Sequence, residues 1–403
     1  MARNASAEIR RRPKDRKAQI ARAAAEAFSE LGYHGVSMEA IAARVDISAA
    51  ALYRHYAGKY ELFRGAVLGL GRQLVDGTDG IDGIDGTADE DPRQQFDVLV
   101  GALVDVALAN RTSGGLYRWE GRYLDDADQA ELLAQIGTVH DRIHRPLARL
   151  RPGLTRRQYL TLSTAVLSVV GSIVDHRVKL PAASVRELLI ELAGAVAAVE
   201  LPGEPAPAES PAASPAPAPD PSTYEALLRE SLILFHRHGY RDTSMEDIAA
   251  AVGIPASGIY KYFSGKADIL AAVFRRASDR VSGGLAAVVA SAADPHEALS
   301  GVIDSYVART FDQPELEYVY YTERLNMSAA DQRIVHDLQR SVVESWVELV
   351  VAVRPQWSRA QARFAVHAAM ALVIDLGRLQ RYPDTEQARA VVRRLVEAVL
   401  LGD

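Results

Sequence analysis

The chain of 403 residues contains no cysteine. This absence excludes disulfide bonds, thiolate nucleophiles and cysteine-ligated zinc or iron–sulfur sites, and it fits a reducing cytoplasm. No run of about 18 apolar residues is present, so we expect no membrane span and no membrane partner. The first residues lead into charged side chains and not into an apolar segment, so we expect no secretory signal. These absences together predict a cytoplasmic protein.

An excess of positive charge is also missing, because the net charge is −6. A uniformly basic, nucleic-acid-binding coat is therefore excluded, although a local basic patch is not. Residues 1–17 form such a patch, with seven basic and two acidic side chains. An arm of this kind is either a solvated tail or a contact to DNA phosphates. The residues of the arm that we assign to DNA are Arg10, Arg11, Arg12, Lys14, Arg16 and Lys17.

Signatures of catalysis and of cofactor binding are lacking as well. The sequence has no glycine-rich phosphate loop, no His-Glu-x-x-His and no Gly-x-Ser-x-Gly, so we expect no enzyme and no cofactor. His140 and His144 have the helical spacing of a metal pair, but no third ligand accompanies them. Surface histidines are the better interpretation, and no metal site is predicted.

Apolar residues recur at intervals of three and four, and no alternating strand pattern stands out. This periodicity predicts amphipathic helices over 155–177, 184–200, 358–381 and 385–401. The predicted fold class is all-α.

The chain contains two copies of one segment. Residues 20–63 align without a gap on residues 227–270, and 16 of these 44 positions are identical. Between the copies, residues 202–221 hold eight prolines, which cannot build a packed element and favour an extended linker. We therefore predict two similar modules, 1–201 and 222–403.

The repeated segment is expected to form a helix-turn-helix. In the first copy, Gly32 ends a helix that starts near residue 20, because glycine tolerates a left-handed turn. Ser37 can cap a second helix over 38–45, and a short helix over 49–56 follows a three-residue turn. In the second copy, we expect Thr243 and Glu246 to form a capping box and Gly253 to lie in the turn.

The order Phe…Gly-Tyr…Ser-Met-Glu-x-Ile-Ala…Tyr-Arg-His-Tyr-x-x-Lys resembles the DNA-binding domain of TetR-type transcriptional regulators. The resemblance covers both modules. It implies helix-turn-helix domains at 1–64 and 222–269, and helical ligand-binding and dimerisation domains at 65–201 and 270–403. The duplicated chain with its basic arm also resembles tandem actinobacterial regulators, such as the repressor of a mycobacterial mce lipid-transport operon.

The resemblance assigns the DNA contacts residue by residue. Base contacts fall near the start of the short helix, at Ala49 and Ala50 and at Ala256 and Ser257. Alanine can touch a thymine methyl group but cannot read guanine, so readout is expected to use Arg54 and Lys261, the arm or DNA shape. The phosphate-binding and helix-start positions complete the set: Tyr53, His55, Lys59, Tyr260, Tyr262, Lys266, Ser37, Ser48 and Ser244.

The two helix-turn-helix domains, called the first and second heads below, differ in charge. The first has Asp46 where the second has Gly253 in the turn, and residues 1–64 carry a net charge of +5. Residues 222–276 carry only +1 and have no basic arm. We expect the heads to bind DNA unequally, and a degenerate second head is the alternative.

For the remaining domains, the resemblance implies a ligand pocket and two pairing helices in each module. Our pocket residues are Trp119, Tyr123, Tyr318 and Tyr321, although aromatic residues at helical spacing are more often core. The expected effector is small and hydrophobic, such as a lipid or steroid acyl-CoA. Pairing of the two modules within one chain is expected, with a homodimer as the alternative. The predicted function is a ligand-released repressor of a lipid or steroid operon; the alternative is a ligand sink or scaffold.

Overall fold

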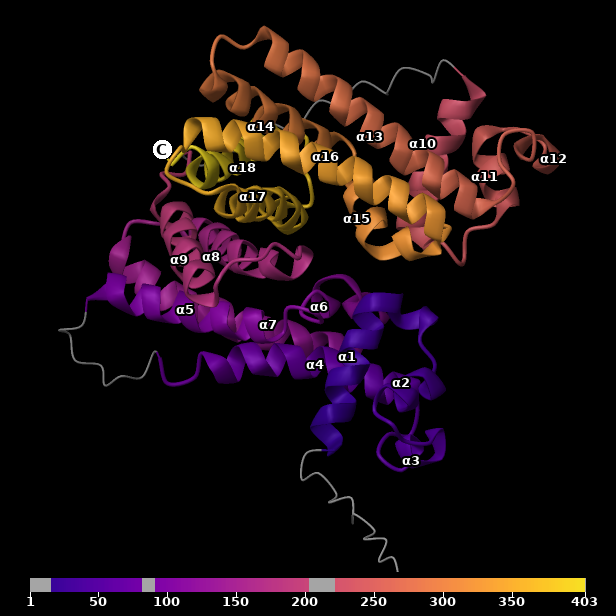
Figure 1. The fold of residues 1–403 in the computed structure, drawn as a ribbon, viewed down its shortest axis with the longest axis horizontal. Coiled ribbons are helices and arrows are strands. Elements are labelled where there is room, and N and C mark those ends of the chain that lie inside the picture. The colour runs from indigo at the N-terminus through magenta and orange to yellow at the C-terminus, as the bar shows by residue number, and fades with distance from the viewer. Residues whose placement is uncertain (1–15, 82–90, 203–221, 403) are drawn as a thin grey trace, which may run out of the picture. The chain divides into compact units, whose positions relative to one another are not determined.

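A computed structural model describes residues 16–81, 91–202 and 222–402 of the chain. In this part of the chain the regular elements are helices and no strand occurs, which confirms the all-α class (Figure 1). The predicted linker, apart from Pro202, lies outside the described residues, and so do Arg10, Arg11, Arg12 and Lys14.

The first compact unit contains the first head. It comprises the described residues up to Gln73 together with Thr112–Ala134. Its helices are α1 (Arg16–Gly35), α2 (Met38–Arg44), α3 (Ala49–Tyr53), most of α4 (Lys59–Gly77), α6 (Leu116–Trp119), the 3-10 turn η1 (Gly121–Tyr123) and the start of α7 (Asp126–Leu150).

The second unit contains Leu74–Arg111 and the described residues from Gln135 onward. Its first-module helices are α5 (Pro92–Ala109), the rest of α7, α8 (Arg156–Gly171), η2 (Ser172–Asp175) and α9 (Ala182–Ala198). Its second-module helices are α10 (Thr223–His238), α11 (Met245–Val252), α12 (Ala256–Ile259), α13 (Lys266–Ser291), α14 (Pro295–Asp312), α15 (Pro314–Glu323), η3 (Arg324–Asn326), α16 (Ala329–Val353), α17 (Arg359–Gln380) and α18 (Glu386–Leu400).

Helices α8 and α17 begin with the same local structure. Thr155 and Ser358 each accept a backbone hydrogen bond from a glutamine three residues on, and that glutamine side chain accepts one from the cap residue. This capping box satisfies amides that have no partner inside the helix. The two caps are 203 positions apart. At this offset the helical domain of the second module aligns with that of the first.

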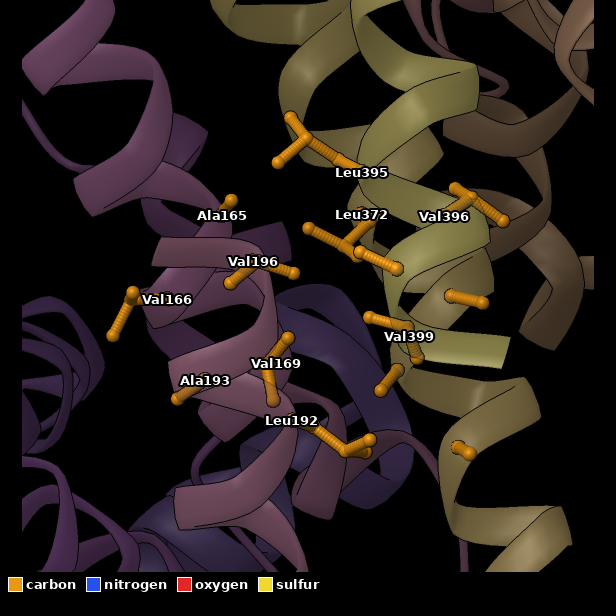
Figure 2. Close-up of a cluster of buried hydrophobic side chains, with 14 of the residues drawn as sticks. Ala165, Val166, Val169, Leu192, Ala193, Val196, Leu372, Leu395, Val396 and Val399 are labelled. Carbon is orange, nitrogen blue, oxygen red and sulfur yellow. The ribbon is translucent and has the colours of Figure 1, made fainter. Parts of the chain in front are cut away.

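The core of the second unit is built from both modules. Helix α8 packs along α17, and α9 packs along α18. Figure 2 shows buried side chains from both modules in this one core: Ala165, Val166, Val169, Leu192, Ala193 and Val196 from the first module, and Leu372, Leu395, Val396 and Val399 from the second. The four predicted helices are confirmed to within a few residues at their ends.

One helical stretch among the described residues is long and apolar enough to cross a membrane, Arg156–Asp175. It consists of α8 and η2, and Leu162, Val166 and Val169 within it are completely buried in the core. Its apolar character is therefore explained by packing inside the protein.

Candidate nucleic-acid interface

The first head is held together by aromatic packing. Phe28 of α1 is completely buried, and the ring of Phe63 of α4 meets it edge-on at 5.1 Å. Gly32 interrupts α1 with a backbone φ of 68°, a conformation that glycine adopts without steric cost. The turn to α2 thus follows the predicted glycine.

Serine residues begin both helices of the first helix-turn-helix. The Ser37 hydroxyl accepts a hydrogen bond from the Ala40 amide at 3.1 Å, and the Ser48 hydroxyl accepts one from the Ala51 amide at 3.1 Å. Asp46, between the helices, has a φ of 54°. A residue with a Cβ pays a conformational cost in this left-handed region, so the turn of the first head is strained where a glycine would not be.

The second head has the same layout with different caps. The predicted capping box of Thr243 and Glu246 is wrong by one position, because Ser244 and Asp247 form it. Thr243 is buried, and its hydroxyl donates to the Gly239 carbonyl at 2.9 Å. Gly253 lies in the turn with a φ of 76°, as predicted.

The short helices α3 and α12 present one face to the core and another to solvent. Leu52 and Ile259, at equivalent positions, are completely buried, while the neighbouring Tyr53 and Tyr260 are 50% and 54% exposed. An exposed tyrosine offers a hydroxyl and a ring face to a nucleic acid. The other predicted DNA-binding residues exposed on these segments are Ala50, Arg54, His55, Ala256, Ser257, Lys261 and Tyr262; Ala49 is half-buried.

The equivalent lysines of the two copies, Lys59 and Lys266, have neighbours within the heads. Lys59 and Lys266 each lie over the ring of a tyrosine, Tyr33 or Tyr240, at 4.6 Å from the centroid. The Lys266 ammonium also donates to the carbonyls of Tyr240 and Arg241 at 2.6 and 3.2 Å, and burial lowers its pKa. An ammonium group has three donors, so one donor of Lys266 remains after these two bonds.

The start of α1 continues the basic arm into the described residues. Arg16 donates from its guanidinium to the Val45 carbonyl at the end of α2, at 3.0 Å. Lys17 is exposed. Arg16 therefore joins the start of α1 to the end of α2.

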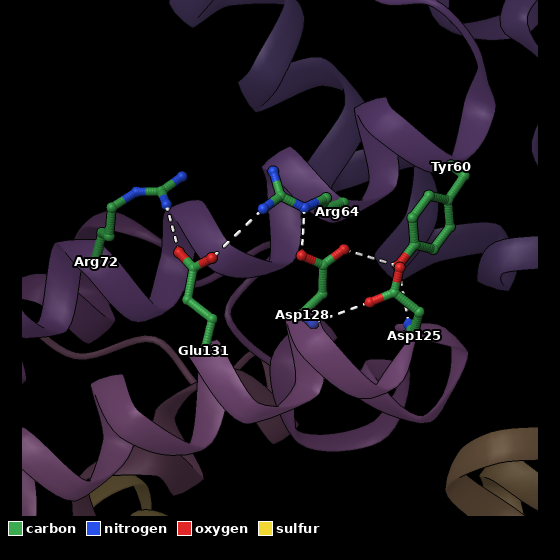
Figure 3. Close-up of polar contacts among 6 residues, drawn as sticks. All are labelled: Tyr60, Arg64, Arg72, Asp125, Asp128 and Glu131. Carbon is green, nitrogen blue, oxygen red and sulfur yellow. Dashed lines mark hydrogen bonds and ion pairs between the residues drawn. The ribbon is translucent and has the colours of Figure 1, made fainter.

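A polar network fixes α4, which follows the first helix-turn-helix, to the start of α7 (Figure 3). The Asp128 carboxylate accepts hydrogen bonds from Arg64 at 2.5 Å and from the Tyr60 hydroxyl at 2.8 Å. Burial alone would raise its pKa, but these bonds hold the pKa of Asp128 below its ordinary value. Glu131 accepts further bonds from Arg64 and Arg72 at 3.4 and 3.1 Å. Sequence reasoning missed this network.

The pocket residues predicted in the first module lie against the head. The Tyr123 ring stacks on Tyr33 at 5.2 Å, and Trp119 is 8% exposed. Between them, Glu120 accepts a hydrogen bond from the Tyr33 amide at 2.9 Å. The Tyr33 amide follows Gly32, where the regular hydrogen bonds of the helix are interrupted. The buried carboxylate therefore accepts the hydrogen bond of an amide that has no acceptor within the helix.

The pocket residues predicted in the second module surround a carboxyl group that sequence reasoning missed. Glu317 precedes Tyr321 by one helical turn on α15, and burial raises the pKa of both side chains. No described residue forms a hydrogen bond or an ion pair with Glu317, which stays half-buried. Tyr320 and Tyr321 meet at 5.3 Å, and Tyr318 packs edge-on against His236 of the second head.

The two histidines considered for a metal pair contact different partners. The His140 ring nitrogen lies 2.9 Å from the Ser163 hydroxyl, and the His144 ring packs against Tyr159 at 4.3 Å. In the described part of the chain, no three His, Asp or Glu side chains are grouped to hold a metal ion.

Comparison with known proteins matches both heads to one family. The family described as "Bacterial regulatory proteins, tetR family" matches residues 20–66 and 227–273. Both heads therefore match the DNA-binding domain of TetR-family regulators. Proteins of this family are transcriptional regulators and not enzymes.

Individual proteins that resemble this chain are more distant. The HTH-type transcriptional activator FasR of Mycolicibacterium smegmatis is 38% identical over 96 residues, which is 24% of this chain and 42% of FasR. The chain thus matches less than half the length of that relative. A TetR-family regulator from Bordetella parapertussis and the ketosteroid regulator KstR2 of Mycobacterium tuberculosis are 18% and 20% identical. Both have a TM-score of 0.40 and cover 45% of this chain and 95% of their own.

Proposed function

We propose that this chain is a sequence-specific DNA-binding regulator that represses its target until a ligand releases it. The observation that carries the proposal is the duplicated helix-turn-helix, with Tyr53 and Arg54 exposed on one copy and Tyr260 and Lys261 on the other. Buried Leu52 and Ile259 anchor the helices that carry them, so these side chains are held on a defined surface.

The first head binds DNA more tightly than the second in this proposal. It carries the basic arm, which adds phosphate contacts and does not read sequence. The second head lacks the arm, and residues 222–276 carry a net charge of only +1. The two half-sites of the operator therefore differ, and the site is not a palindrome.

The two modules act as a pair within one chain. Packing of α8 and α9 on α17 and α18 supports this arrangement, since it buries the helices that are otherwise available to a second subunit. One chain then presents two heads to one operator. The alternative is a homodimer with four heads.

The effector enters the second module, beside Glu317 and Tyr321. We propose a small hydrophobic molecule of the lipid or steroid class that carries a hydrogen-bonding oxygen, because tyrosine hydroxyls and the carboxyl group of Glu317 lie in this region. A lipid-transport operon, of the kind that the resemblance to the mce repressor suggests, is the proposed target. FasR is described as an activator. Repression by this chain is therefore tested against activation, by measuring transcription of the target with and without the protein.

DNA titration in increasing salt tests this function. We expect binding to the chain's own upstream DNA, weakened steeply by salt, because basic residues displace counterions from phosphates. Arg54→Ala is expected to weaken binding more than Lys261→Ala and to lower the salt slope by about one. Binding that is absent, or equal at low and high salt, would favour the ligand sink or scaffold.

Ligand release is tested by reciprocity. If ligand lowers the affinity for operator by some factor, operator must lower the affinity for ligand by the same factor. Equal ligand affinity with and without operator DNA contradicts the release mechanism while leaving DNA binding intact. Since the proposed target is chromosomal DNA, we place the protein in the cytoplasm.

A further inference from the structure

The contact between α8, η2 and α9 of the first module and α17 and α18 of the second is called the module interface here. The polar contacts of the module interface are not symmetric, although some of its apolar contacts are. Leu192 and Leu395, and likewise Val196 and Val399, are equivalent residues 203 positions apart that meet in the same core. Apolar packing of this kind does not distinguish one module from its copy.

The first asymmetric contact joins Ser168 to Asp375. The Ser168 hydroxyl donates to the Asp375 carboxylate at 2.7 Å across the module interface. The equivalent of Ser168 in the second module is Ala371, which has no donor. The equivalent of Asp375 in the first module is Ser172, whose hydroxyl donates to its own helix at the Val169 carbonyl. This hydrogen bond is therefore available only when unlike modules meet.

The second asymmetric contact lies at the rim. Arg354 forms an ion pair with Glu191 of α9 at 3.2 Å. The equivalent of Glu191 in the second module is Arg394. If two second modules paired in the same geometry, Arg354 would face Arg394, and like charges at an interface oppose association. The equivalent of Arg354 in the first module is Arg151, so this contact opposes the pairing of second modules and not the pairing of first modules.

The third asymmetric contact is aromatic. The His176 ring, which is 6% exposed, stacks on His367 at 4.4 Å and meets Phe364 edge-on at 4.4 Å. The first-module equivalents of Phe364 and His367 are Thr161 and Thr164. Two first modules would thus replace both rings with threonines and lose the stacking that aromatic pairs contribute.

We propose that the module interface recognises unlike modules, so that its partner is the other half of the same chain and not a second copy. Each pairing of like modules loses the Ser168–Asp375 bond. Pairing of second modules also opposes arginines, and pairing of first modules also loses ring contacts. A homodimer assembled module by module needs both like pairings at once. This inference rests on the proposed function only in taking one chain as the carrier of two heads.

Cysteine cross-linking tests the proposal in the full-length chain, which has no cysteine of its own. Ser168→Cys with Asp375→Cys, treated with a short bis-maleimide, is expected to give a chain linked to itself at the mass of one chain. The matched control mixes chains that carry only Ala371→Cys with chains that carry only Asp375→Cys, because these positions of different chains come together only when two second modules pair. It is expected to give no linked dimer.

Three results would overturn the proposal. One is a covalent dimer from the control pair. Another is a dimer from the first pair, which means that unlike modules pair between chains. The last is a folded protein in which neither the first pair nor the more exposed rim pair, Glu191→Cys with Arg354→Cys, gives a link within one chain. DNA binding is measured separately on the same samples, so failure of the proposed regulator and failure of this interface are distinguished.

Discussion

Replacing Asp128 by Asn is expected to loosen helix α4 in the first head. Asp128 is 6% exposed, and its carboxylate accepts bonds from Arg64 and Tyr60 on α4 (Figure 3). Asparagine keeps the size of the side chain but removes its charge. It leaves Arg64 with Glu131 alone, at 3.4 Å.

The magnitude follows from the exposure of the two partners. A hydrogen bond to a charged group contributes about 1.5–3 kcal/mol, and breaking a fully buried ion pair costs about 3–5 kcal/mol. The Arg64 side chain is 42% exposed, so solvent screens part of the interaction. We therefore expect a loss of about 2 kcal/mol in the free energy that keeps α4 closed, which corresponds to an increase of about 30-fold in opening.

Amide hydrogen exchange measures this opening directly, because exchange of a protected amide reports its local opening free energy. Exchange in α4 is expected to accelerate by about 30-fold in Asp128→Asn. The matched control is Asp331→Asn in the second module, where Arg275 donates to a less buried carboxylate at 2.8 Å. There we expect a loss of about 1 kcal/mol in the free energy that keeps α13 closed. The reasoning is refuted if α4 exchange changes by less than about threefold, or if the control has the larger effect.

Three further predictions depend on buried titratable groups or on backbone strain. Burial lowers the pKa of His367 to about 4, so His367 should contribute about 3 kcal/mol to the stability that the second unit loses as pH falls from about 6.5 to 4. In urea unfolding, His367→Gln should show a smaller acid loss than the unmodified protein, with the remainder owed to buried His176, whose pKa is lowered to about 2; an equal loss would contradict the prediction. Burial raises the pKa of Glu317, so its contribution is present below about pH 4.3 and is lost as pH rises; Glu317→Gln should raise the thermal midpoint at pH 8 and leave it unchanged at pH 4. Asp46→Gly should relieve the left-handed backbone and stabilise the first head by about 0.5–1 kcal/mol, whereas Gly253→Asp should destabilise the second; thermal unfolding that shows the opposite order would exclude strain as the cause.

Much of each head was predictable because its structure is local. Gly32 ends a helix, Gly253 makes a left-handed turn, and Ser37 caps α2, and each of these acts within a few residues of the sequence. The second capping box was misplaced because Thr243-Ser244-Met245-Glu246-Asp247 contains two overlapping cap patterns one residue apart. Burial of Thr243 decides between them, and burial depends on the tertiary structure.

The contacts behind the heads were not predictable from local pattern. Glu120 meets the Tyr33 amide across 87 positions, and Asp128 meets Tyr60 across 68. Nothing near either carboxylate in the sequence indicates its partner. Glu317 gave a weak signal, as a charged residue on the same helical face as Tyr320 and Tyr321, but the effect of burial on its pKa became visible only with the packing of α15.

The most direct test of the account is the mass and stoichiometry of the protein in solution, by light scattering alone and with duplex DNA from its own upstream region. The account predicts a particle of 43.7 kDa, the mass of one chain, that binds one duplex per chain at a site with two unlike halves. A particle of twice that mass, or two chains on every duplex, would contradict the claim that one chain supplies both heads.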